Sequence, residues 1–144
     1  MSYQIYLSSI IYLLIGSAIL LVDQYGGRYL LLLRLKNFAI SSVQTSAGFV
    51  VIGLLLTILK IVFPIPPGPP LLGDLIPSLA LFSLSLYHFT LLLRQKKSVK
   101  GVRNPHQEVF HKTGSLIETH KKNLGFTILV IAALHFLFPQ AILL

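Results

Sequence analysis

A cluster of prolines in the middle of the chain constrains its fold more than any other feature. Six of the eight prolines fall within residues 57–77, and five of them stand at positions 64, 66, 67, 69 and 70. Proline lacks an N–H and clashes with the preceding helical turn, so a helix cannot continue through this run. The apolar stretch before the run must end near Phe63, and the next can begin only around Leu71. We therefore predict a short, stiff hinge over residues 64–74 between two helices.

The composition places these helices in a membrane. Hydrophobic residues make up 54% of the chain and charged residues only 11%, whereas soluble domains carry about 25% charged residues. The apolar residues also come in long blocks, which leaves little mass outside the membrane. We predict one polytopic membrane domain over residues 1–144. Cysteine is absent, which excludes disulfides and thiolate metal sites.

Four segments have the length and hydropathy of membrane spans. A spanning helix needs about 20 mostly apolar residues, and residues 4–22, 47–63, 75–93 and 124–140 meet this requirement. The predicted fold is an all-α integral membrane protein with four transmembrane helices in two hairpins. No basic residue precedes the first apolar core, and no small-x-small cleavage pattern follows it. We therefore expect a retained span there rather than a removable signal peptide.

The basic residues predict an orientation. Residues 23–46 and 94–123 contain eleven of the 12 Lys and Arg residues, and Lys60 is the twelfth. These two segments lie on the same side if all four spans cross. Because positive charge is enriched in cytoplasmic loops, we predict that both segments are cytoplasmic and that the hinge and both termini lie outside. The expected location is the cell inner or plasma membrane.

The segment between the first two spans has two readings. Its apolar run, residues 29–33, is too short to cross a membrane and is followed by Arg34 and Lys36. This pattern suits an interfacial helix that keeps its leucines among lipid headgroups. An extension of a neighbouring span, packed within the bundle, explains it equally well.

The two halves of the sequence resemble each other weakly. A Gly-Phe pair opens the second span at residues 48–49 and the fourth at residues 125–126. The second span closes with Leu-Lys-Ile-Val-Phe-Pro at residues 59–64, and the fourth with Leu-His-Phe-Leu-Phe-Pro at residues 134–139. A parallel repeat about an axis along the membrane normal would produce this pattern. Chance similarity between residues common in membrane spans is an equal explanation.

Two charges flank the hinge and are the first candidates for a site. Lys60 lies near the end of its span, where its ammonium is expected to reach the outer interface by snorkelling. Asp74 lies at the start of the next helix, where a carboxylate favours the helix N-terminus and can serve as an N-cap. We predict that the two form an ion pair that fixes the hairpin. The functional alternative is a polar site for an ion or a substrate headgroup.

Histidines within the spans are the second candidates. His88 is predicted toward the cytoplasmic end of the third span and His135 toward the outer end of the fourth. A transmembrane haem needs two imidazoles at one depth, so the two predicted levels argue against a shared haem. We expect His88 to bond to a neighbouring helix, with metal or haem binding as the minor alternative, and we predict no cofactor.

Basic and hydroxyl residues complete the candidate contacts. Five residues after the third span are expected to contact anionic lipid or a partner: Arg94, Lys96, Lys97, Lys100 and Arg103. Nucleic acid is disfavoured because Phe110 is the only Phe, Tyr or Trp within residues 94–123. Small hydroxyl residues let membrane helices approach closely. Ser78, Ser83 and Ser85 therefore mark a helix interface, within the bundle or with another chain.

These features favour a non-catalytic function. The sequence contains no HExxH, no GxSxG and no Gly-rich phosphate loop, so we do not expect an enzyme. The predicted function is an accessory, assembly or scaffold subunit that binds another membrane protein or copies of itself. The alternative is a small oligomeric transporter or channel with Lys60, Asp74 and His88 as its polar elements. A membrane haem or metal protein is the third candidate.

Overall fold

The computed structural model describes residues 2–26, 29–63, 74–100 and 107–138. These residues form five helices and no strand: α1 (Ser2–Tyr25), α2 (Leu30–Ile40), α3 (Val43–Val62), α4 (Leu75–Lys100) and α5 (Gln107–Leu137). The all-helical prediction is therefore confirmed. The prolines of the predicted hinge at 64–70 lie outside the described residues, but α3 ends at Val62, just before them.

Three of the helices are long and apolar enough to span a membrane. The qualifying segments are Tyr3–Val22, Val43–Val62 and Leu75–Gln95, which correspond to the first three predicted spans. Residues 94–123, which we expected to be a loop, are instead helical on both sides of residues 101–106. The hydropathy falls at Arg94, but Arg, Gln and Lys are good helix formers, so α4 continues into polar sequence.

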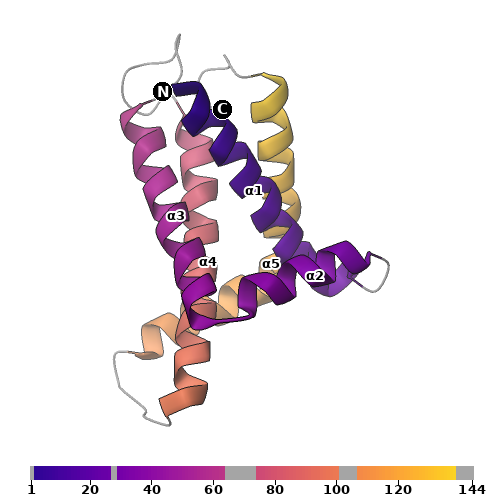
Figure 1. The fold of residues 1–144 in the computed structure, drawn as a ribbon, viewed down its shortest axis with the longest axis vertical. Coiled ribbons are helices and arrows are strands. Elements are labelled where there is room, and N and C mark those ends of the chain that lie inside the picture. Colours follow the sequence, from indigo (N-terminus) through magenta and orange to yellow (C-terminus); the bar gives the residue numbers. More distant parts are fainter. Residues whose placement is uncertain (1, 27–28, 64–73, 101–106, 139–144) are drawn as a thin grey trace.

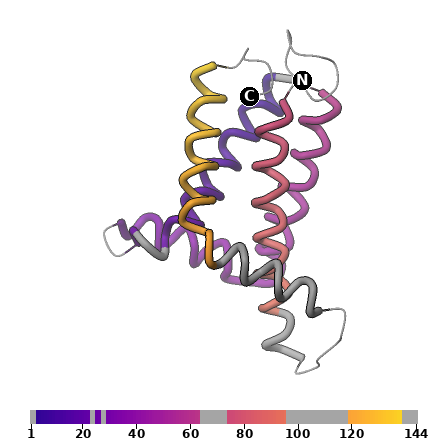
Figure 2. Tube along the Cα trace, turned by 180° about the vertical axis from the view of Figure 1, so that it is seen from behind, coloured from indigo at the N-terminus to yellow at the C-terminus, as the bar shows by residue number. Residues whose placement is uncertain are grey.

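The helices α1, α3 and α4 and the later part of α5 run side by side in alternating directions (Figure 1). The starts of α1 and α4 and the ends of α3 and α5 gather at one end of the bundle, while α2 crosses at the other end. The most extensive contacts join α3 to α4 and α1 to α5, and Figure 2 shows both pairs from behind. The first and last helices are therefore neighbours in space.

Hydrogen bonds fix the corner where α2 meets the bundle. The Ser42 hydroxyl accepts a bond from the Thr45 N–H at 3.0 Å and caps the N-terminus of α3. The Ser46 hydroxyl donates to the Ala39 carbonyl at 3.1 Å. The side-chain amide of Gln95 on α4 donates to the Ile40 carbonyl at 3.0 Å. The C-terminal end of α2 is thereby bonded to both α3 and α4.

The interior is an apolar core to which every helix contributes. Its buried members include Leu13 and Leu20 of α1, Leu56 of α3, Leu84 of α4 and Ile128 of α5, together with Ala39 of α2.

Close approach at this core depends on small residues, as is usual between membrane helices. A Cβ atom on Gly53 of α3 would collide with the hydroxyls of Ser85 on α4 and Tyr12 on α1. Gly53 therefore lets three helices meet.

Gly53→Ala should destabilise the protein, whereas Gly48→Ala should not. Both glycines lie in α3, and Ala favours a helix over Gly by about 1 kcal/mol. A Cβ on Gly48 meets nothing within 4 Å, but one on Gly53 forces apart a packed core, which costs about 1–3 kcal/mol. Thermal unfolding in detergent measures both changes. An equal effect of the two substitutions would contradict the proposed role of Gly53.

Candidate functional site

Four polar side chains meet at the end of the bundle where α1 begins and α5 ends. They are Tyr6 of α1, Lys60 of α3, Asp74 just before α4, and His135 of α5. We call this group the Lys60 cluster. Because each of the four long helices carries or adjoins one member, the cluster joins the whole bundle at this level.

Lys60 and Asp74 form a buried ion pair. The Lys60 Nζ lies 2.8 Å from the Asp74 Oδ2, and their side chains are only 1% and 4% exposed. The position of Lys60 differs from the expected snorkelling, because its ammonium turns into the bundle instead of rising to the surface. The presence of a carboxylate, an imidazole and an aromatic face inside the bundle explains this difference.

His135 and Tyr6 surround the same ammonium. The Lys60 Nζ lies 2.9 Å from the His135 Nε2 and 5.1 Å from the centroid of the Tyr6 ring, within the range of a cation–π contact. An ammonium has only donors, so the His135 Nε2 accepts and the ring proton resides on Nδ1. The Tyr6 hydroxyl donates to the His135 carbonyl at 2.7 Å, and the two rings stand edge to face at 4.9 Å.

The backbone at the start of α4 holds Asp74 in place. The Asp74 carbonyl accepts bonds from the Ser78 N–H at 3.1 Å and from the Ser78 hydroxyl at 2.7 Å. Pro77 lies in the first turn of α4, where its missing N–H leaves no helical bond unmade. The first turn of α4 is thus fixed in the position that directs the carboxylate of Asp74 toward Lys60.

The buried charges of the Lys60 cluster are tolerated only while both charged partners are present. Removing two charges from water is expensive, and their attraction offsets this cost only where geometry and hydrogen bonding are good. Here one ammonium and one carboxylate balance, and the imidazole and the Tyr6 ring occupy further sides of the ammonium. Loss of one charged partner would leave the other buried without its counter-charge.

His88 lies in a separate aromatic environment. Its ring is 1% exposed, stacks on Phe49 at 5.0 Å and meets the edges of Tyr87 at 5.6 Å and Tyr12 at 6.4 Å. Within the part of the chain that the structure describes, its Nε2 has no hydrogen-bond partner. The bond to a neighbouring helix that we expected is therefore not formed by this nitrogen.

The three predicted interface serines differ in position. Ser78 and Ser85 are buried within the chain at 2% and 1% exposure, and the Ser85 hydroxyl donates to the Val50 carbonyl of α3 at 3.4 Å. Ser85 thus lies at a helix interface inside one chain. Ser83 is half-buried, and its hydroxyl donates to the Leu79 carbonyl of its own helix at 2.8 Å. Only Ser83 of the three can take part in an outer contact.

The predicted basic contacts lie largely outside what the structure describes. Arg94 is exposed on α4. Lys96, Lys97 and Lys100 belong to the same helix, but their side chains are not among the described ones, and Arg103 lies outside the described residues.

Sequence reasoning missed that His135 and Tyr6 join Lys60. The repeated span endings did contain an indication, because His135 occupies the position in the fourth span that Lys60 occupies in the second. Residues that face an axis of such a repeat would meet there. For Tyr6, nothing in the sequence showed which face of α1 turns inward.

Comparisons with known proteins identify a family. The model of one family, a domain of unknown function, matches residues 1–135 of the chain. No curated protein and no solved structure matches.

Single replacements of Lys60 or Asp74 should lower the stability more than their joint replacement. Lys60→Leu or Asp74→Leu leaves one buried charge without its counter-charge, and breaking a buried pair typically costs about 3–5 kcal/mol. Lys60→Leu with Asp74→Leu removes both charges. Thermal unfolding of the three variants in detergent measures the coupling. Ser83→Ala, on the outer side of α4, is the control and should leave the melting temperature unchanged; strictly additive single effects would show that the pair is not coupled.

Proposed function

We propose that this chain, a member of a protein family of unknown function, is an integral membrane protein with four transmembrane helices that acts as a non-catalytic accessory, assembly or scaffold subunit of a membrane complex. The closed geometry of the Lys60 cluster carries this proposal. Lys60, Asp74 and His135 are 1%, 3% and 0% exposed, and Lys60 bonds to both of the others across the helices. Their chemistry is directed at holding the bundle together.

The contacts of α5 support a fourth crossing, over residues 124–140. Near one end of α1, Tyr6 meets His135; near the other end, the rings of Tyr25 and Phe126 lie 6.0 Å apart, edge to face. The described part of α5 from Phe126 to His135 therefore packs along α1, and at 1.5 Å per residue it is about 14 Å long, roughly half of a hydrocarbon core of about 30 Å. We propose that the rest of residues 124–140 completes the crossing.

The position of α2 supports an interfacial helix. It crosses the axes of α1 and α3 at the end of the bundle away from the Lys60 cluster (Figure 1). Leu30 and Leu31 are 74% and 78% exposed, and Arg34 is exposed as well. Exposed leucines beside a basic residue suit the headgroup region of a bilayer. With the basic segments cytoplasmic, both termini and the Lys60 cluster lie toward the outside of a cell inner or plasma membrane.

The outer face of α3 is the surface that we propose for a partner. Only 33% of its span is buried, compared with 56% for the spans of α1 and α4. Large apolar side chains cover the exposed face: Val51, Ile52, Leu54, Leu55, Ile58 and Val62. Another membrane protein or a second copy of the chain would pack against this face.

A transporter or channel is the second candidate, because Lys60 contacts both Asp74 and His135, and the proposed placement puts these ionisable groups within the bilayer. Ionisable residues at such depth often mark ion or proton pathways. In liposomes, proton or ion flux that is lost in Asp74→Asn and retained in Ser83→Ala would favour this function over the accessory one.

Purification from native membranes tests the accessory function. In mild detergent, followed by cross-linking and mass spectrometry, the chain should retain a membrane protein or a second copy. Leu55→Trp on α3 should release it, because a larger side chain disturbs the packed contact. Leu79→Trp on α4 changes an equally exposed leucine, 56% against 55%, and should not. If both variants retain the partner equally, the α3 face is not the contact. If the unaltered chain purifies alone, the proposed accessory function is wrong.

The orientation predicts which introduced cysteines are accessible. Cysteine at Ser2 should react with an impermeant thiol reagent in intact cells, and cysteine at Ser98 should react only after permeabilisation. The chain has no cysteine of its own, so the background is clean. The opposite labelling pattern would reverse the orientation.

A further inference from the structure

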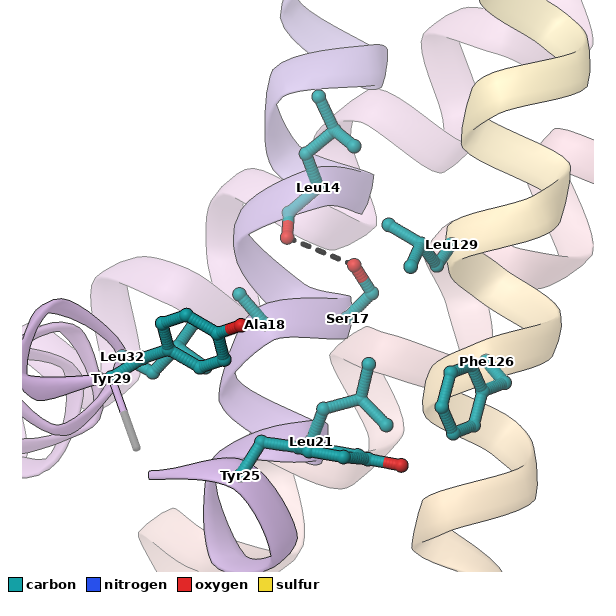
Figure 3. Close-up of a pocket in the computed structure, with 9 residues that line it drawn as sticks. All are labelled: Leu14, Ser17, Ala18, Leu21, Tyr25, Tyr29, Leu32, Phe126 and Leu129. Carbon is teal, nitrogen blue, oxygen red and sulfur yellow. Dashed lines mark hydrogen bonds between the residues drawn. The ribbon is translucent and has the colours of Figure 1, made fainter. Parts of the chain in front are cut away.

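A groove runs along the outer side of α1 at the end of the bundle where α2 lies. Its volume is about 480 Å³, within the range of about 300–1,000 Å³ typical of ligand sites. Leu14, Ala18 and Leu21 form its floor, Leu32 lines one side, and Phe126 and Leu129 line the other. Figure 3 shows α1 between these two walls. We call this feature the α1 groove.

The lining of the α1 groove is suited to a hydrocarbon chain. The hydroxyl of Ser17 donates to the Leu14 carbonyl at 2.9 Å (Figure 3), so its donor is already used within α1. The rings of Tyr25 and Phe126 meet at 6.0 Å and bring α1 and α5 together at one end of the groove. Tyr25 lines the groove at this end, and Tyr29 lines it on the α2 side (Figure 3). Tyrosine is enriched at the membrane–water interface. An occupant would thus be apolar along most of its length and polar near the tyrosines.

Basic residues lie beyond both walls at that same end. Lys122 is exposed and precedes Phe126 by four residues, which places it on the same face of α5, one turn nearer the polar end. On α2, Lys36 follows the lining residue Leu32 by four residues, which places it on the same face of that helix. In the part of the chain that the structure describes, Asp and Glu do not line the groove. A negatively charged headgroup next to the tyrosines would therefore meet positive charge from two helices.

We propose that the α1 groove binds one acyl chain of an anionic phospholipid from the leaflet on the side of α2, with Lys122 of α5 and Lys36 of α2 holding its phosphate. The proposal rests on the membrane placement proposed above but not on the accessory function. Each basic residue near a bilayer surface attracts anionic lipid enough for a preference of about five-fold. Lys122 should therefore make the groove selective, whereas an apolar surface elsewhere on the bundle should take any lipid.

Tryptophan fluorescence provides a direct test, because the chain contains no tryptophan. Phe126→Trp places a probe in the groove, and Phe82→Trp places one on the exposed side of α4, where Phe82 is 47% exposed. Each variant is reconstituted into phosphatidylcholine vesicles that contain a small fraction of a lipid brominated in its acyl chains. This brominated lipid is phosphatidylglycerol in one sample and phosphatidylcholine in the other. Bromine quenches a nearby tryptophan. Leu32→Trp, on the opposite wall, serves if Phe126→Trp does not fold.

At the groove probe, brominated phosphatidylglycerol should bind more strongly than brominated phosphatidylcholine by about five-fold or more, while the Phe82→Trp probe should respond equally to both. Adding Lys122→Gln should lower that preference about five-fold, whereas Arg94→Gln, which changes an exposed basic residue on α4, should leave it intact. A preference that is unchanged by Lys122→Gln would overturn the role of that residue. Equal quenching at both probes would overturn selective binding.

The remaining outcomes separate this inference from the proposed function. If neither lipid quenches the groove probe while both quench the Phe82→Trp probe, a protein segment or a second copy covers the groove, and the lipid site is wrong. If neither lipid quenches the Phe82→Trp probe, the chain does not lie in the bilayer as proposed, and the membrane placement itself fails.

Discussion

A lysine ammonium inside an apolar bundle must be neutralised, and the arrangement of the helices follows from that requirement. Lys60 is 1% exposed, and a charge so far from water is tolerated only with a counter-charge and well-placed hydrogen bonds. Asp74 supplies the charge, which brings the end of α3 to the start of α4. His135 and Tyr6 add α5 and α1. One ammonium thereby sets the relative position of four helix ends.

Away from the Lys60 cluster, the hydroxyl groups mostly bond to the backbone of their own helices. Ser9 and Ser17 donate to carbonyls three residues earlier on α1, and Thr57 donates to the Gly53 carbonyl on α3. Such bonds satisfy a hydroxyl without a partner on another helix. The helices can then approach through small residues and van der Waals contact. The Lys60 cluster thus fixes how the helix ends are arranged, and small residues along the rest of the helices allow close packing.

The sequence predicted the helices better than it predicted how each is rotated about its axis. Hydropathy and the proline run located the first three spans and the end of α3, because both depend on local chemistry. The hinge also implied that Lys60 and Asp74 would be near each other. Whether Lys60 turned outward to water or inward depended on which side chains of α1 and α5 lie beside its ammonium. Tyr6 and His135 are distant in sequence, at separations of 54 and 75 residues from Lys60. The extension of α4 to Lys100 was missed because hydropathy measures the membrane boundary and not the helix.

The order in which the chain is made gives the Lys60 cluster a further consequence. Lys60 leaves the ribosome after Tyr6 but before its hydrogen-bonded partners, with Asp74 following 14 residues later and His135 75 residues later. In the membrane placement proposed above, a nascent chain that has inserted only α1 and α3 thus carries an ammonium whose counter-charge has not yet arrived. That charge would make the second span costly to hold at depth until α4 enters, and its environment would be complete only with α5. In this placement, an interrupted or truncated product would therefore differ from the finished protein by a Lys60 ammonium without its counter-charge.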